Sequence, residues 1–95
     1  MHIHEFQEMM KQLYFYRDSK RGIRGTLEWL FDEVEELREA LEKGDKKETE
    51  EEFADVIAWL ASLANIARID LEKAALEKYP GTCPKCLHSP CQCTF

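Results

Sequence analysis

Two short acidic motifs have the residue types and the spacing to hold a metal ion. Glu33-Val34-Glu35-Glu36 and Glu52-Phe53-Ala54-Asp55 each place two carboxylates three residues apart. Residues three apart lie on one face of a helix, so each motif would aim its two carboxylates in one direction. A single motif of this kind carries little weight, because a helical chain with 19 acidic residues produces it often on a solvated face. The position of each motif on its helix therefore decides whether its carboxylates are better explained as metal ligands or as solvated surface charge.

The first motif lies in a helix expected to begin near Thr26, as its N-cap, and to stop at Gly44. Its expected core stripe consists of Leu27, Leu30, Phe31, Val34, Leu37 and Leu41. At about 100° per residue, the other acids gather on the opposite, solvated side, namely Glu28, Asp32, Glu35 and Glu39. Glu33 and Glu36 instead share a strip with Trp29 and Ala40 that borders the core.

The second motif lies in a helix expected from about Lys47 to about Arg68. From Phe53 to Ala67 this helix is apolar nearly all round, which predicts burial on every face. Glu52 and Asp55 point the same way as three of its apolar residues, Val56, Trp59 and Ile66.

Burying an unpaired carboxylate is costly, so carboxylates in such places are paired with a base or bind metal. In these two helices Arg38 is the main basic candidate, and a metal cation is the favoured partner. Four carboxylates on two antiparallel helices can surround one or two hard cations. With oxygen ligands alone, Mg²⁺, or Mn²⁺ in its place, is the natural choice.

Two further helices complete the expected fold. In the first, apolar residues recur at helical spacing, namely Ile3, Phe6, Met10, Leu13 and Tyr14. The polar segment 17–22 then predicts a break that ends in glycine. After the second acidic helix, Asp70 is the expected N-cap of a short helix over 71–79, which Pro80-Gly81 ends. No useful β-type alternation is present, so the prediction is an all-α protein, a helical bundle or half of one.

Composition limits the function classes. A chain of 95 residues makes one small domain, and small helical proteins often gain stability by self-association. The net charge of −6 argues against binding of nucleic acid but leaves nucleotides open, because a divalent cation can carry positive charge between acids and phosphates. No apolar run approaches a membrane span and the start lacks the order of a signal peptide, so the expected location is the cytoplasm, with no membrane partner.

The linked motifs resemble the MazG-like all-α nucleotide pyrophosphohydrolases. That family's signature is ExxE followed, after a short helical connection, by ExxD, and the similarity covers Gly25 to Lys78. The segment Ile69-Asp70-Leu71-Glu72-Lys73-Ala74, after Leu63-Ala64-Asn65, also resembles the family's continuation.

This resemblance implies hydrolysis of nucleoside triphosphates to the monophosphate and pyrophosphate. It implies a four-helix core completed by a homodimer, often a dimer of dimers. By position, Glu33, Glu36, Glu52 and Asp55 would be the metal ligands and would carry the catalysis.

Several other residues are candidates for substrate binding. Arg21, Arg24, Lys73 and Lys78 could hold the phosphates, although each is about as easily an ordinary solvated base. Trp29 could stack on a base, or belong to the core or the dimer interface. Asn65 could orient the base or sugar, or make a buried polar contact.

A cysteine-rich tail, residues 80–95, follows the helical domain of residues 1–79. Its four thiols are Cys83, Cys86, Cys91 and Cys93. Clustered thiols in a chain without a secretory signal favour a metal over disulfides, and four thiolates suit structural Zn²⁺. Disulfides, reduced thiols, zinc shared between subunits and replacement of one cysteine by His88 are the alternatives. For the whole chain, one alternative to the enzyme is a non-catalytic, self-associating helical module with a structural zinc tail. Another is a zinc-tail adaptor that binds protein or nucleic acid, although the charge of −6 argues against nucleic acid.

Overall fold

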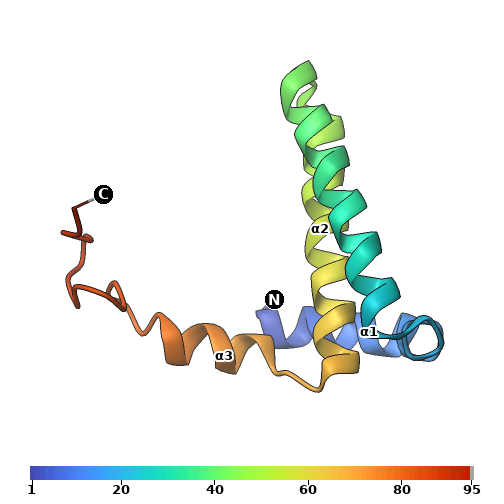
Figure 1. The fold of residues 1–95 in the computed structure, drawn as a ribbon, viewed down its shortest axis with the longest axis horizontal. Coiled ribbons are helices and arrows are strands. Elements are labelled where there is room, and N and C mark those ends of the chain that lie inside the picture. The colour runs from blue at the N-terminus through green and yellow to red at the C-terminus, as the bar shows by residue number, and fades with distance from the viewer. Residues whose placement is uncertain (95) are drawn as a thin grey trace.

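The computed structural model describes residues 1–94, which contain three helices followed by an irregular tail (Figure 1). The helices are α1 (Ile3–Lys43), α2 (Lys46–Ala67) and α3 (Leu71–Lys78). These residues contain no strand, which confirms the all-α prediction. None of the described helices is both long enough and apolar enough to cross a bilayer. Phe95, the last residue of the expected tail, lies outside the described residues.

A single residue, Gly22, divides α1 into two arms. Its φ of 83° and ψ of 171° lie in a region that is open almost only to glycine. The expected break over 17–22 is therefore confirmed at its last residue. The expected N-cap at Thr26 is wrong, because the helix resumes directly after Gly22 and Thr26 lies fully buried within it.

The remaining helix ends follow the local chemistry of the sequence. Gly44 ends α1 in the left-handed region, with φ 77°, and donates its N–H to the carbonyl of Ala40 at 3.1 Å. Asp45 accepts the backbone N–H of Glu48 at 3.1 Å and so caps α2. Asp70 caps α3 in the same way, as expected, by accepting the N–H of Lys73 at 3.1 Å.

The second arm of α1 runs antiparallel to α2 and makes a helical hairpin, and the first arm lies across the base of this hairpin (Figure 1). Small residues allow the two helices to approach. Ala40 and Ala61 are completely buried, and Ala64 is nearly so. The strip of α1 that faces α2 is thus the one that contains Ala40 and Glu33, next to the expected core stripe.

Only half of the expected core stripe is covered within one chain. Leu27, Leu30 and Leu37 are half-buried, whereas Phe31, Val34 and Leu41 are exposed. On α2, Phe53, Ile57 and Leu60 are also exposed, so burial on every face is not reached in the single chain. The reason is geometric: two helices cover only one side of each other, and a wide apolar stripe needs more neighbours.

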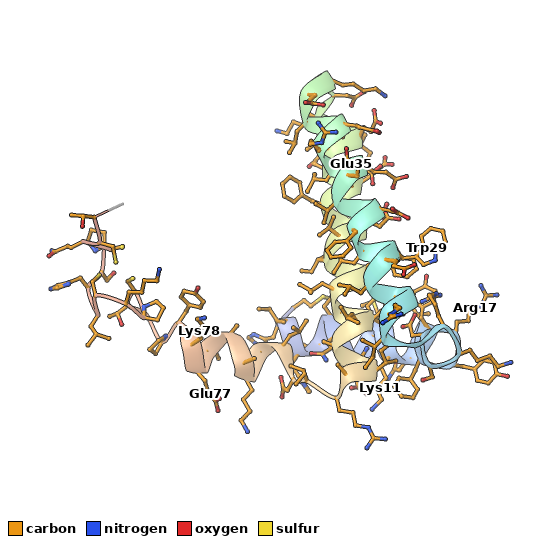
Figure 2. All side chains as sticks on the ribbon, in the orientation of Figure 1. Lys11, Arg17, Trp29, Glu35, Glu77 and Lys78 are labelled. Atoms are coloured by element: carbon orange, nitrogen blue, oxygen red, sulfur yellow. The ribbon has the colours of Figure 1, made fainter. Side chains whose placement is uncertain are left out.

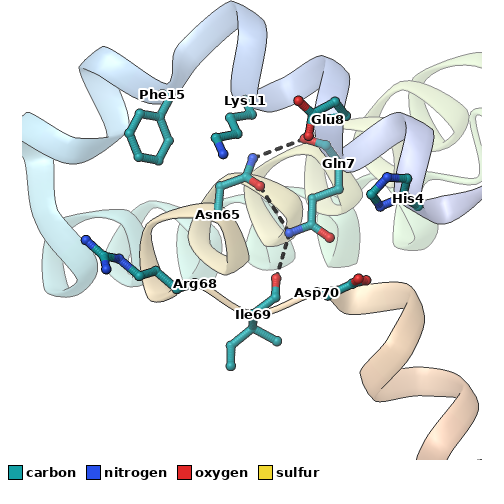
Figure 3. Close-up of a pocket in the computed structure, with 9 residues that line it drawn as sticks. All are labelled: His4, Gln7, Glu8, Lys11, Phe15, Asn65, Arg68, Ile69 and Asp70. Carbon is teal, nitrogen blue, oxygen red and sulfur yellow. Dashed lines mark hydrogen bonds between the residues drawn. The ribbon is translucent and has the colours of Figure 1, made fainter.

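The first arm of α1 is tied to the turn between α2 and α3 by the side chain of Gln7 (Figure 3). Its Nε2 donates to Oδ1 of Asn65 at 3.0 Å and to the carbonyl of Ile69 at 2.7 Å. Its Oε1 accepts the N–H of Leu71 at 2.9 Å, and Nδ2 of Asn65 donates to the carbonyl of Gln7 at 3.1 Å. Gln7 is only 7% exposed, so these bonds fix the base of the hairpin in a partly buried place.

Candidate metal centre and the adjoining cavity

Three carboxylates from the two facing helices come together in the hairpin. One oxygen each from Glu33, Glu36 and Glu52 lies within 4.8 Å of the other two. Glu33 and Glu52 are half-buried, and Glu36 is exposed at the edge of the group. The strip that places Ala40 against α2 also places Glu33 and Glu36 there, since these residues lie seven and four positions before it. The structure thus joins the two acidic motifs into one carboxylate cluster, Glu33, Glu36 and Glu52.

The electrostatics of the carboxylate cluster are unfavourable in the absence of a cation. Burial raises the pKa of Glu33 from 4.5 to about 7, with further contributions from a hydrogen bond to Glu36 and from the charges of Glu36, Asp55 and Glu52. Burial also raises the pKa of Glu52, followed by the charge of Glu36. Oε2 of Glu33 and Oε1 of Glu52 are buried and have no hydrogen-bond partner among the described residues.

No basic side chain in residues 1–94 forms an ion pair with these acids. Arg38, the main basic candidate from the sequence, pairs with Glu35 and, at 3.4 Å, with Glu42 on the solvated side of α1. The position of Glu35 on that side is visible in Figure 2. The carboxylate cluster therefore has no counter-ion among residues 1–94, and a metal cation could take that place.

The fourth expected ligand, Asp55, lies one turn beyond Glu52 and is outside the group of three oxygens. It is close enough for its charge to raise the pKa values of Glu33 and Glu52. Asp55 also lines a cavity of about 270 Å³ between the first arm of α1 and α2. The other lining residues are Tyr14, Arg17, Asp18, Arg21, Ala58 and Trp59. Asp55 thus borders both the carboxylate cluster and a cavity that contains two arginines.

Arg21 is held in this cavity by three neighbours. Its Nη1 donates to Oδ1 of Asp18 at 2.9 Å and to Oγ1 of Thr26 at 3.4 Å. Its guanidinium lies over the ring of Trp59, 4.8 Å from the centroid. Trp59 in turn stacks on Trp29, with centroids 5.3 Å apart and ring planes 8° from parallel.

Sequence reasoning did not single out Asp18 and named Trp59 only as an apolar neighbour. Asp18 is 2% exposed, and its second oxygen, Oδ2, has no hydrogen-bond partner among the described residues. The available signal was the spacing of three between Asp18 and Arg21, which suits an ion pair on one helical turn. This spacing did not predict an ion pair because the polar segment 17–22 indicated a break. In the structure the helix continues through most of this segment.

The other candidate substrate residues lie apart from the carboxylate cluster within one chain. The side-chain amide of Asn65 forms hydrogen bonds with Gln7 through both Oδ1 and Nδ2. Asn65 lies at the edge of a cavity of about 410 Å³ (Figure 3). Lys73 and Lys78 are exposed on α3, which extends from the base of the hairpin (Figures 1 and 2). Arg24 is exposed on α1. The proposed contacts of these residues with substrate stay predictions.

The four cysteines of the tail gather in a second group, well separated from the hairpin (Figure 1). All four are free thiols. This group and the carboxylate cluster share no residue, so the two are separate candidate metal sites within the described chain.

Comparison with known families bears on the carboxylate cluster. The family model of the MazG nucleotide pyrophosphohydrolase domain matches residues 21–87, more than half of the chain. This range includes Arg21, both acidic motifs and the short helix α3. No curated protein matches the chain.

Proposed function

Because the chain belongs to the MazG nucleotide pyrophosphohydrolase family, we propose that it hydrolyses nucleoside triphosphates, ribo- or deoxyribo-, to the monophosphate and pyrophosphate. The observation that carries this proposal is the carboxylate cluster, which joins both family motifs and has no counter-ion among the described residues. A purely structural group of acids would be fully solvated or paired, whereas in this cluster one oxygen of Glu33 and one of Glu52 are buried without a partner.

The donor set fits a hard divalent cation. All the donors are carboxylate oxygens, and two of them, Oε2 of Glu33 and Oε1 of Glu52, are buried without a partner. We propose that Glu33, Glu36, Glu52 and Asp55 would hold Mg²⁺, or Mn²⁺ in its place. When bound, the cation would supply Lewis acidity and neutralise charge that develops on the phosphates.

The cavity beside Asp55 is the proposed place for the triphosphate. Arg21 has a fixed position between Asp18 and Trp59, so its remaining N–H groups would donate to phosphate oxygens without a large loss of side-chain entropy. Arg17 lines the same cavity. Arg24, Lys73 and Lys78 would add positive charge only where the substrate or a second chain brings them near.

The proposed reaction is attack of water on the α-phosphorus. The new bond joins the water oxygen to this phosphorus, and the bond to the oxygen that bridges the α- and β-phosphorus breaks, so that pyrophosphate leaves. The water proton passes to a carboxylate oxygen of the site. The nucleoside part would lie toward Trp29 and Trp59, whose stacked rings offer an aromatic edge.

We propose that the exposed apolar side of the hairpin is covered by a second copy of the chain, in a homodimer or a dimer of dimers. Phe31 is 63% exposed and Phe53 is 55% exposed, although each belongs to a helix whose apolar pattern predicts burial. Exposure of several large apolar side chains in a small helical chain favours self-association. Size-exclusion chromatography with light scattering measures the state directly.

The test of the activity is pyrophosphate release from each ribo- and deoxyribonucleoside triphosphate with Mg²⁺ or Mn²⁺. Glu36→Gln and Asp55→Asn should each lower turnover by about 10- to 100-fold while the helical circular dichroism spectrum stays unchanged. Glu39→Gln, on the solvated side of the same helix, is the matched control and should keep wild-type turnover. Absence of release from all substrates by folded, metal-loaded protein would favour the alternative, a non-catalytic self-associating module. Wild-type turnover in the Glu36 and Asp55 variants would refute the site assignment.

A further inference from the structure

The described part of the cysteine-rich tail, residues 80–94, consists of turns and irregular backbone and has no apolar core of its own. It contains no helix or strand, and Leu87, its largest aliphatic side chain, is 73% exposed. Segments this small that lack an apolar core are generally held by disulfides or by a metal. The tail offers four cysteines for either role, and His88 as a further possible metal ligand.

The distances between the sulfur atoms discriminate between these two possibilities. The four Sγ atoms all lie within 4.8 Å of one another, with Cys83 and Cys93 3.7 Å apart and Cys86 and Cys91 4.0 Å apart. In a disulfide the sulfurs would be about 2.05 Å apart. Four ligands at the usual Zn–S distance of about 2.3 Å form a tetrahedron whose edges are about 3.8 Å long. The two measured pairs are close to this edge.

The backbone around the thiols supports them as charged ligands. The N–H of Gln92 donates to Sγ of Cys86, and the N–H of Cys93 donates to Sγ of Cys91, each at 3.3 Å. Such donors offset the negative charge of thiolates, as they do around bound metals. Two further backbone hydrogen bonds close the turn that contains Cys83 and Cys86. The N–H of Leu87 donates to the carbonyl of Cys83 at 2.8 Å, and the N–H of Cys83 donates to the carbonyl of His88 at 3.0 Å.

We propose that Cys83, Cys86, Cys91 and Cys93 of one chain bind a single Zn²⁺ in a closed tetrahedral site. Four thiolates fill the coordination sphere, so no position remains for water or substrate and the site is structural. His88 is outside the group of four ligand atoms and is not a ligand. Binding displaces up to four thiol protons to solvent, and no oxidation takes place. The proposal is independent of the activity assigned to the carboxylate cluster.

The test uses the full-length protein, purified under reducing conditions and reconstituted with Zn²⁺ or Co²⁺. We expect one zinc per chain by elemental analysis, and a cobalt absorption spectrum with the intense thiolate charge-transfer bands and visible bands of a tetrahedral four-sulfur site. Cys91→Ser should lose the zinc on dialysis against a mild chelator, whereas His88→Ala should retain one zinc and an unchanged cobalt spectrum. Both variants should keep the far-ultraviolet helical spectrum, since the hairpin does not depend on the tail.

Three results would overturn the proposal. The first is absence of zinc from reduced protein after reconstitution. The second is a stoichiometry of one zinc per two chains, which would mean a site shared between subunits. The third is a cobalt spectrum altered by His88→Ala. Glu36→Gln, a change in the carboxylate cluster, is the control. This variant should keep its zinc even where it no longer hydrolyses triphosphates.

Discussion

Neutralising Glu33 should have opposite effects on the metal-free and metal-loaded protein. The pKa of this carboxyl rises from 4.5 to about 7, chiefly through burial and then through Glu36, Asp55 and Glu52. At about 1.4 kcal/mol per pH unit, this rise sets an upper bound of about 3.5 kcal/mol on the penalty that ionised Glu33 imposes on the folded state. Because the side chain is only half-buried, solvent screening lowers the expected value to about 1 kcal/mol.

The pH dependence of this penalty has a definite sign. The folded carboxyl binds its proton more tightly than the unfolded one, so the group costs nothing below about pH 4.5 and its full penalty appears above about pH 7. In metal-free protein at pH 8, Glu33→Gln should therefore raise the free energy of unfolding by about 1 kcal/mol. The gain should shrink to about half or less at pH 5.5, where folded Glu33 is mostly protonated.

Added Mg²⁺ should reverse the order of stability. A ligand that binds only the folded state at 100 times its dissociation constant adds about 2.7 kcal/mol, and the variant that lacks one ligand should gain much less. The assay is urea denaturation followed by circular dichroism, with and without chelator, at one protein concentration. Glu28→Gln, a change at an exposed position on the solvated side of α1, is the control and should alter neither state appreciably. The reasoning fails if Glu33→Gln destabilises the metal-free protein at pH 8, or if Mg²⁺ stabilises variant and wild type equally.

Three further outcomes are expected. The affinity for Mn²⁺, measured by titration calorimetry, should fall about tenfold from pH 8 to pH 6. The reason is that a pKa of about 7 leaves Glu33 ionised in only about a tenth of the sites at the lower pH. An affinity that does not change with pH would contradict this. Gly22→Ala should lower the free energy of unfolding by about 1–3 kcal/mol, since alanine is strained at φ 83° and ψ 171°; an unchanged urea midpoint would refute the role of the break. Gln7→Leu should cost about 1–3 kcal/mol by leaving three partly buried groups without partners, Oδ1 of Asn65, the carbonyl of Ile69 and the N–H of Leu71. Hydrogen exchange should then accelerate in the turn between α2 and α3 rather than at Gly44.

The sequence alone determined the helical elements and most of their ends. Gly22, Gly44 and the cap at Asp70 act through the backbone within a few residues, so local chemistry is sufficient to place them. Thr26 was misplaced because a residue that suits an N-cap is also tolerated inside a helix when its hydroxyl finds a partner, here Arg21.

Spacing along a helix also determined that Glu33 and Glu36 share a strip with Ala40. Spacing could not determine whether this strip or the adjacent apolar core stripe faces α2. Either one is compatible with a helix that is covered on one side. Tertiary structure chose the strip with the small residue, since Ala40 and Ala61 let the helices approach and larger side chains do not. That choice brings Glu33 and Glu36 to Glu52, and leaves Phe31 and Val34 exposed.

The surroundings of the site were decided entirely by tertiary structure. Gln7 and Asn65 are 58 residues apart, and Arg21 meets Trp59 across the molecule, so no local pattern connects them. Their contacts depend on the direction in which the first arm of α1 leaves Gly22. Local residues thus determine what each helix can present, and only the way the helices pack determines which side chains meet, because contacts between distant segments depend on the relative placement of whole elements.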